Sequence, residues 1–279
     1  MDVAATRGGI ETHSPNLCCN LLELPPTSME YEEARSFRHY THAPIQEAII
    51  DIRIDPSASR SLDDLECLHQ QMKGTYPERR DLIVGLLSGT LEAGQLTATS
   101  KQDTTGFIFT NLEKTKVVQC RLNGFSFSQL APYETWDRFR DEARKNWILY
   151  RTAMGSTPVI HVALRYINQI NIPIPFRDFS DYIRTYPEVS TDLPQELSGY
   201  FMQLSIPQKD IEAMLVLNQV LVPPPKSEVA SVILDIDIIR NGLKLKSDEE
   251  VWNVLEILRA RKNSVFEACI TNATRELIR

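Results

Sequence analysis

Several features that mark membrane and secreted proteins are missing from this sequence. No run approaches the roughly 18 consecutive apolar residues that a membrane-spanning helix needs. The chain does not begin with a basic region, an apolar stretch and a small-residue cleavage site, so we do not expect secretion. Its five cysteines are scattered and include no C-x-x-C pair, which is typical of reduced thiols inside a cell. These absences predict a soluble cytoplasmic protein that does not act at a membrane.

The sequence also has fewer basic than acidic residues. The chain has 30 lysines and arginines against 37 aspartates and glutamates, and its formal net charge is -7. A negative net charge weakens nonspecific attraction to phosphate backbones, and no local run of basic residues offsets it. We therefore do not expect nucleic-acid binding. The sequence contains neither a Gly-rich phosphate loop nor a G-x-S-x-G elbow, so it predicts no cofactor and no specific catalytic activity.

The chain divides into an arm and two similar parts. Residues 1–40 mix glycines, prolines and polar residues without a sustained period, which predicts a loosely ordered N-terminal arm. Residues 41–156 form a first half and residues 157–279 a second half. In each, a proline precedes a long strand, which is followed by a helix, a meander of short strands and a Trp-containing helix.

In the first half, the alternation of Ala48, Ile50 and Ile52 with polar residues predicts a strand. Ser61 and Asp64 are spaced like a capping box, which predicts a helix that ends at Gly74. No element is predicted for residues 75–105. The remaining predicted elements are strands at 106–110, 116–121 and 124–130 and a helix at 134–154.

In the second half, the pattern predicts a long strand over residues 159–172 and a short helix over 176–185. Three strands follow, and three consecutive prolines separate the last two of them. We expect these strands at 200–204, 211–221 and 231–240, a final helix at 248–269, and a polar tail.

Short matches suggest that the halves arose by internal duplication. Pro44 and Pro158 precede equivalent strands, and Ala143-Arg144-Lys145-Asn146 recurs as Ala260-Arg261-Lys262-Asn263. The predicted fold class is α+β, with two strand-helix-meander-helix halves and mainly antiparallel sheets. The two long strands are then expected to lie side by side, with Glu47 matching His161 and Asp51 matching Arg165.

The polar sides of the long strands form the first candidate site. Strand alternation places the charged or polar residues of each strand on one face. This face has two interpretations, a binding surface for a ligand or partner and a structural network of salt bridges, and ionisable groups within sheets more often belong to the second kind. The residues are Glu47, Asp51 and Arg53 in the first strand and His161, Arg165 and Gln169 in the second.

Two weaker candidates accompany it. Asp235 and Asp237 share a strand face, and such carboxylates can hold Mg²⁺ for phosphoryl or nucleotidyl transfer, although Arg53 or Arg165 would pair with them equally well. An aromatic stripe on the helix at 134–154 has the spacing of core residues, with a ligand pocket as the alternative. Its members are Trp136, Phe139, Trp147 and Tyr150.

Two strand motifs resemble those of a known family. Pro44-Ile45-Gln46-Glu47-Ala48 and Leu164-Arg165-Tyr166-Ile167-Asn168 are similar to segments of a sporadically distributed family of uncharacterised bacterial proteins. The resemblance covers about residues 40 to 275. Because that family has no assigned activity, the resemblance supplies no catalytic residue. Its sporadic distribution implies an accessory locus, such as one for phage defence or toxin neutralisation.

Three functions follow as hypotheses. The first is a noncatalytic interaction or regulatory protein that acts with a protein partner encoded nearby, with a homodimer left open. The second is a small-molecule sensor with its ligand in a cleft between the halves, where Glu47, Asp51, His161 and Arg165 would supply polar anchors. The third is a metal-dependent nucleotide enzyme that uses Asp235 and Asp237.

Overall fold

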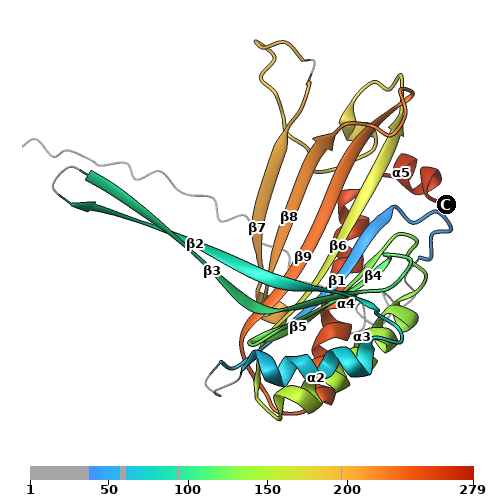
Figure 1. Ribbon diagram of the computed structural model, residues 1–279. Coiled ribbons are helices and arrows are strands. Elements are labelled where there is room, and N and C mark those ends of the chain that lie inside the picture. Colours follow the sequence, from blue (N-terminus) through green and yellow to red (C-terminus); the bar gives the residue numbers. More distant parts are fainter. Residues whose placement is uncertain (1–37, 57–60, 93–94, 196) are drawn as a thin grey trace, which may run out of the picture. The chain divides into compact units, whose positions relative to one another are not determined.

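The structure is a computed structural model that describes residues 38–56, 61–92, 95–195 and 197–279. Within these residues, nine strands form one antiparallel sheet accompanied by four α-helices and two short 3-10 helices, which confirms the α+β class (Figure 1). The expected arm lies almost wholly outside the described residues. No helix in the described part is long and apolar enough to cross a membrane.

The first half contributes five strands and two helices. Its strands are β1 (Ile45–Ile54), β2 (Glu78–Glu92), β3 (Gln95–Thr110), β4 (Lys116–Arg121) and β5 (Gly124–Leu130), and its helices are α2 (Leu62–Met72) and α3 (Trp136–Met154).

The second half contributes the other four strands and two helices. Its strands are β6 (Val159–Pro173), β7 (Phe201–Gln208), β8 (Ala213–Val222) and β9 (Val229–Leu245), and its helices are α4 (Asp248–Cys269) and α5 (Asn272–Leu277). Two 3-10 helices lie at Phe179–Asp181 and Lys209–Ile211.

The sheet joins the two halves at its centre. Its strand order is β2-β3-β4-β5-β1-β6-β9-β8-β7, and β1 pairs with β6 in antiparallel orientation. The expectation that the two long strands lie side by side is therefore confirmed. In the strand register, His161 lies opposite Arg53 and Arg165 lies opposite Ile49.

Local sequence signals explain where the helices begin. Ser61 and Asp64 form the expected capping box of α2, and the Thr135 side chain accepts a hydrogen bond from the backbone N–H of Arg138 at the start of α3. Ser247 and Glu250 form a second capping box before α4. These caps satisfy backbone N–H groups that have no partner within the helix.

Three predicted segments were wrong or incomplete. The helix at 176–185 is only the 3-10 turn Phe179–Asp181, because the chain then leaves the helical path and Ile183 forms an isolated β-bridge with Ile270. The polar tail contains α5. Residues 75–105 contain β2 and most of β3, which form a long hairpin that pairs with β4 only over Gly106–Thr110.

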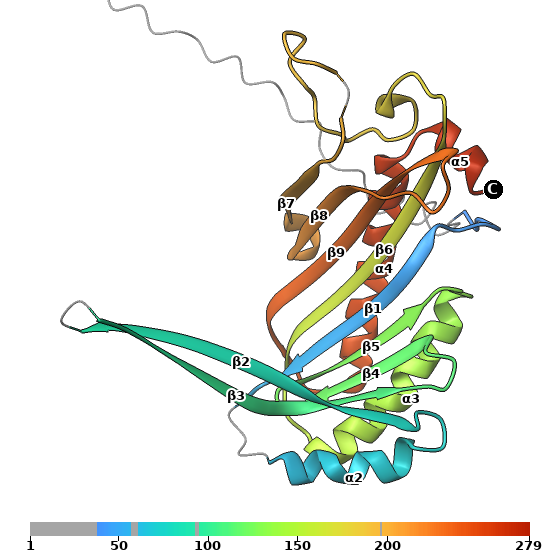
Figure 2. The same cartoon turned by 45° about the horizontal axis from the view of Figure 1, so that its top comes forward.

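The two faces of the sheet have different roles. Ile50 and Ile52 of β1 and Leu164 of β6 are fully buried on the face that α3 and α4 cover, here called the helix face (Figure 2). Alternate residues point to the opposite side, the polar face, which carries Asp51 and Arg165. The core lies between the sheet and the helices, so any hollow there is surrounded by aromatic and aliphatic side chains.

Candidate functional site

On the polar face, Asp51 is the centre of a cluster of charges. Its carboxylate accepts hydrogen bonds from Arg121 and from Arg53, the latter at 3.1 Å, and lies 3.2 Å from Nε2 of His161. Nδ1 of His161 lies 2.6 Å from the side-chain oxygen of Asn241. These hydrogen bonds and positive charges hold the pKa of Asp51 well below its usual value, although burial alone would raise it.

A second cluster lies beside the first on β6, β8 and β9. Arg165 donates two hydrogen bonds to Asp235, at 2.8 and 2.7 Å, and Asn218 donates a third at 3.0 Å. Asp237 lies opposite Arg165 in the strand register, yet its Oδ1 is buried without a hydrogen-bond partner. Burial raises the pKa of Asp237 to about 6, and the nearby Arg165 only partly offsets this effect.

The remaining two predicted site residues stand outside these clusters. Glu47 lies on β1 opposite Ile167 in the strand register. Gln169 makes a long 3.4 Å hydrogen bond to Asn171 on the same strand. The structure therefore brings Asp51, Arg53 and His161 together and pairs Arg165 with Asp235, a partner that the sequence had allowed.

The geometry of the polar face matches a structural network more closely than a binding surface. Both oxygens of Asp235 are engaged by Arg165, as the sequence had allowed, which leaves the Asp235–Asp237 pair poorly arranged for Mg²⁺. Among the described residues, no group of three or more His, Cys, Asp or Glu side chains is placed to hold a metal ion. A hollow of about 610 Å³ at one end of this face is lined by Arg53, His161 and Asn241 among others.

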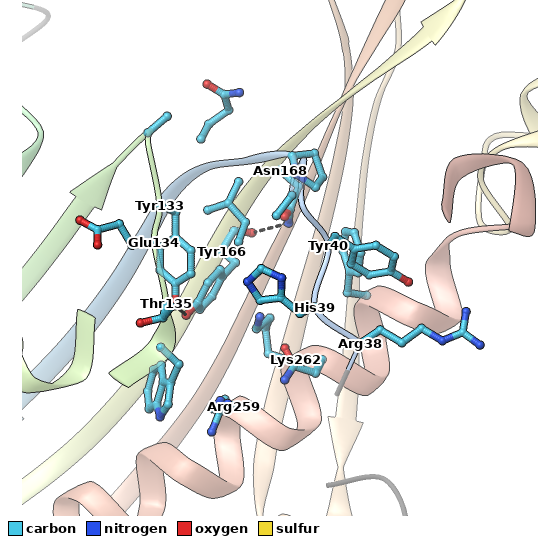
Figure 3. Close-up of a pocket in the computed structure, with 18 of the residues that line it drawn as sticks. Arg38, His39, Tyr40, Tyr133, Glu134, Thr135, Tyr166, Asn168, Arg259 and Lys262 are labelled. Atoms are coloured by element: carbon cyan, nitrogen blue, oxygen red, sulfur yellow. Dashed lines mark hydrogen bonds between the residues drawn. The ribbon is translucent and has the colours of Figure 1, made fainter. Parts of the chain in front are cut away.

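A pocket of about 630 Å³ lies on the helix face, near the junction of the two halves. Its lining comes from the segment before β1, the β5–α3 connection, β6 and α4. Figure 3 shows the labelled side chains grouped around it: Arg38, His39 and Tyr40; Tyr133, Glu134 and Thr135; Tyr166 and Asn168; and Arg259 and Lys262.

Direct contacts between α3 and α4 form one wall of this pocket. Trp136, at the first turn of α3, donates its indole N–H to Glu256 of α4 at 2.8 Å, and the Arg259 guanidinium lies 5.3 Å from the Trp136 ring centroid. Glu256 also accepts a 3.2 Å hydrogen bond from Arg259. The wall is therefore held by both halves, and the fold fixes the position of Arg259.

The floor contains a pair of tyrosines. The hydroxyls of Tyr133 and Tyr166 are 2.8 Å apart, and their rings meet edge to face with centroids 5.6 Å apart. Burial raises the pKa of Tyr133 to about 12 and that of Tyr166 well above its ordinary value, so both keep their protons at neutral pH. This floor offers an aromatic surface and a hydroxyl pair.

Lys262 is the most unusual side chain in the pocket. Its Nζ lies 3.7 Å from the Tyr166 ring centroid, in a cation–π arrangement, and no carboxylate within the described residues is at salt-bridge distance from it. Loss of hydration in this apolar setting, followed by repulsion from Arg259, lowers the pKa of Lys262 from 10.5 to about 7.

The three carboxylates that line the pocket are already paired with other groups. Glu134 is paired with Arg138, and Asp137 lies 3.1 Å from Arg140. Glu267 accepts hydrogen bonds from Arg275 at 2.8 Å and from the Tyr40 hydroxyl at 2.5 Å. The negative charges of the lining are therefore neutralised by other residues, whereas the amine of Lys262 is not neutralised by any of them.

Sequence reasoning missed Lys262 as a site residue. The residue had been noticed only as part of the repeated Ala-Arg-Lys-Asn segment, whose first copy places Lys145 on the exposed side of α3. In the aromatic stripe, Phe139, Trp147 and Tyr150 are fully buried core residues, as the favoured interpretation predicted. Trp136 is also buried in the core, and it lines the pocket as well.

Comparisons with known proteins add no assignment to these observations. Searches against protein-family models, curated proteins and solved structures found no match to this chain, so the family resemblance of the strand motifs remains a prediction.

Proposed function

We propose that this protein is a noncatalytic ligand-binding protein that holds a small organic anion in the pocket between its two halves. One observation carries the proposal: Lys262 and Arg259 lie in a pocket whose own carboxylates are all paired elsewhere. Arg259 is already paired with Glu256, so the negative charge of a carboxylate or phosphate in the ligand would mainly neutralise Lys262. The function corresponds to a small-molecule sensor, at a different place from the polar strand faces considered first.

The size and lining of the pocket support a ligand of moderate size. Pockets of about 300 to 1,000 Å³ are typical of small-molecule sites, and the observed volume of about 630 Å³ falls within that range. Tyr133, Trp136 and Tyr166 present ring faces or edges, which favour a flat apolar group in the ligand. The proposed ligand therefore combines a ring or another flat group with an acidic group.

The positive charge of the pocket lining contrasts with the negative net charge of the whole chain. At a net charge of -7, the protein repels anions at long range, so an anion would need local contacts to remain bound. Arg259 keeps its charge at any physiological pH because guanidinium groups lose their proton only at very high pH. An acidic ligand beside Arg259 and Lys262 would gain hydrogen bonds to charged donors, which are stronger than those between neutral groups.

The arrangement of the strands supports a duplication as the origin of this pocket. Outward from the centre of the sheet, the first half runs β1-β5-β4-β3-β2 and the second runs β6-β9-β8-β7, so in each half the last strand before the Trp-containing helix lies beside the long strand. Helices α3 and α4 then occupy equivalent places after the meanders. A pocket at the junction of two such halves would be a consequence of their pairing.

Calorimetric titration of the full chain tests the proposal. We expect benzoate or phenyl phosphate to bind, and neutral benzamide, which has a similar shape, to bind at least about tenfold more weakly. Lys262→Met should reduce the affinity for the acids by about tenfold or more, whereas Lys145→Met, at the equivalent position of the exposed repeat, should leave it unchanged. Equal affinity for acid and amide, or equal loss in both variants, would contradict the proposal.

A protein partner is a second candidate function, and one observation favours it. Strand β7 ends the sheet as the structure describes it, and it carries the exposed apolar side chains of Phe201, 67 % accessible, and Ile206. Edge strands of this kind can pair with another chain. If a partner encoded nearby binds there, Phe201→Asp should abolish its copurification from the native host, and Leu112→Asp, an equally exposed position far from β7 in the sheet order, should not.

A further inference from the structure

We propose that Lys262 is a reactive amine that condenses with the aldehyde of a flat anionic ligand and holds it as an imine. This inference rests on the proposed function, because it assigns a chemical class to the ligand of the same pocket. Arg259 would hold the acidic group of the ligand, and the amine of Lys262 would meet its carbonyl carbon. The protein would then capture its ligand covalently and reversibly without turning it over.

The first argument concerns the surroundings of the amine. A lysine that serves only as a structural cation is usually paired with a carboxylate or points its ammonium group into solvent. Lys262 has no carboxylate partner among the described residues, and its Nζ lies 3.7 Å from the centroid of the Tyr166 ring at the floor of the pocket. Part of the Lys262 side chain remains accessible, and the pocket is the hollow that it lines.

The second argument concerns the charge state of the amine. An amine attacks a carbonyl carbon only when it is neutral. Desolvation and the adjacent Arg259 on α4 favour that form, and the pKa of Lys262 is lowered to about 7. The other groups described around the pocket do not supply a negative charge that would hold Lys262 in its protonated form. Tyr133 and Tyr166 keep their protons, and the carboxylates of the lining are paired with other residues. Arg38 and His39 add further basic groups to the lining.

The reaction balances without a further reagent. The Nζ lone pair forms a bond to the carbonyl carbon, and the carbonyl electron pair moves to oxygen, which takes up a proton as nitrogen loses one. The carbinolamine then loses water and becomes the imine, so aldehyde and amine give imine and water. A flat, conjugated imine would lie against the Tyr166 ring, where the amine already lies.

Selective labelling of the full chain tests this inference. The probe is 4-carboxybenzaldehyde at pH 7 with sodium cyanoborohydride, which reduces an imine to a stable secondary amine, followed by peptide mapping by mass spectrometry. A lysine with a pKa of about 7 has a neutral fraction roughly a thousandfold larger at pH 7 than one with a pKa of about 10.4. We expect Lys262 to be labelled at least about tenfold faster than Lys145, and more slowly when excess benzoate occupies the pocket.

The outcomes separate this inference from the proposed function. If benzoate binds in calorimetry but Lys262 is labelled no faster than Lys145, the imine is wrong and the anion site stands. If Lys262 is labelled rapidly but benzaldehyde reacts as fast as its carboxylated form and benzoate gives no protection, the anion assignment is wrong. Lys262→Arg keeps a positive charge and removes the nucleophile, so that variant should bind benzoate and lose the fast labelling phase. The wild-type labelling pattern decides the matter even if this variant does not fold.

Discussion

The two faces of the sheet differ in how they treat charged side chains. On the polar face, Arg165 neutralises Asp235 and three basic side chains surround Asp51, so most charges have nearby partners. On the helix face, Lys262 lies in an aromatic pocket and has no carboxylate partner in the part of the chain that the structure describes. A paired network stabilises the fold by itself, whereas an unpaired amine lowers stability until something binds it. The comparison therefore separates a network of paired charges from the pocket that we propose as the ligand site.

The largest effect is expected where a buried carboxylate would lose its partner on the polar face. Arg165→Leu leaves Asp235, which is only 5 % exposed, with Asn218 as its remaining side-chain donor. Removal of one member of a buried ion pair is strongly destabilising, and the partial exposure of Arg165 reduces the cost to about 2 to 3 kcal/mol of unfolding free energy. Urea denaturation measures the change.

A double variant provides the control for this network. Arg165→Leu combined with Asp235→Leu removes both charges and should recover most of the lost stability, because a buried ion pair can be replaced by apolar residues at little cost. A single variant that costs less than about 0.5 kcal/mol, within the range of exposed pairs, would show that the polar face is not held together by its charges.

The next largest effect is a gain in stability, expected from a substitution on the helix face. Lys262→Met should stabilise the protein by roughly 1 to 3 kcal/mol at pH 7, because it removes an amine that is costly to bury and keeps an apolar chain of similar length. Since the folded-state pKa of about 7 lies below the ordinary 10.5, the unfolded chain binds more protons between these values, and wild-type stability rises with pH there. The advantage of the variant should therefore shrink toward pH 10.

The matched control is Lys145→Met. This residue occupies the equivalent place in the first copy of the repeated segment, but its side chain is exposed on α3. Its replacement should change the unfolding free energy by no more than about 0.5 kcal/mol, as is usual at the surface. If both lysine variants behave alike, Lys262 is an ordinary surface residue and the contrast between the two faces is lost.

A third, smaller effect is expected at Asp237, a carboxylate of the polar face whose pKa is raised and not lowered. Asp237 has a pKa raised to about 6 from 3.8, so its contribution to stability is full below pH 3.8 and is lost as the pH rises through 6. Asp237→Asn should then stabilise the protein by about 1 to 2 kcal/mol at pH 8 and leave it unchanged near pH 3.5. Asp235→Asn should instead destabilise it at pH 8, because Arg165 would lose its carboxylate partner.

The sequence predicted most strands of the sheet and failed at one margin, the β2–β3 hairpin. The alternation of Ala48, Ile50 and Ile52 identifies a strand with one buried side, and the capping box at Ser61 marks a helix start, because these signals are local. The β2–β3 hairpin pairs mainly with itself, and its sequence lacks a regular alternation of core and surface residues. A helix was expected over 176–185, but a β-bridge between Ile183 and Ile270 holds the end of that segment in an extended conformation.

The candidate pocket could not be predicted in the same way. Strand alternation was sufficient to place Asp51 and His161 on one face, and the register then determined their contact. The contact between Lys262 and Tyr166 joins a helix and a strand about 100 residues apart, and the identical Ala-Arg-Lys-Asn segment on α3 leaves Lys145 exposed. The same four residues thus occupy two environments, and only tertiary packing distinguishes them.

The smallest predicted effect compares two arginines that share one carboxylate. Arg53 is 53 % exposed and Arg121 is 21 % exposed, and both donate to Asp51. Arg53→Met should lower the unfolding free energy by less than about 0.5 kcal/mol, because water screens that pair, whereas Arg121→Met should lower it by about 1 kcal/mol or more.

The pKa of Asp51 is lowered in the folded state, so the stability that this carboxylate provides is present above pH 3.8 and is lost as the pH falls toward its folded-state pKa. Urea denaturation should therefore show a larger loss for Arg121→Met at pH 7, and this difference should shrink as the pH falls from 3.8 toward the folded-state pKa of Asp51. Equal costs for the two arginines would mean that burial does not decide the strength of charge pairs on the polar face.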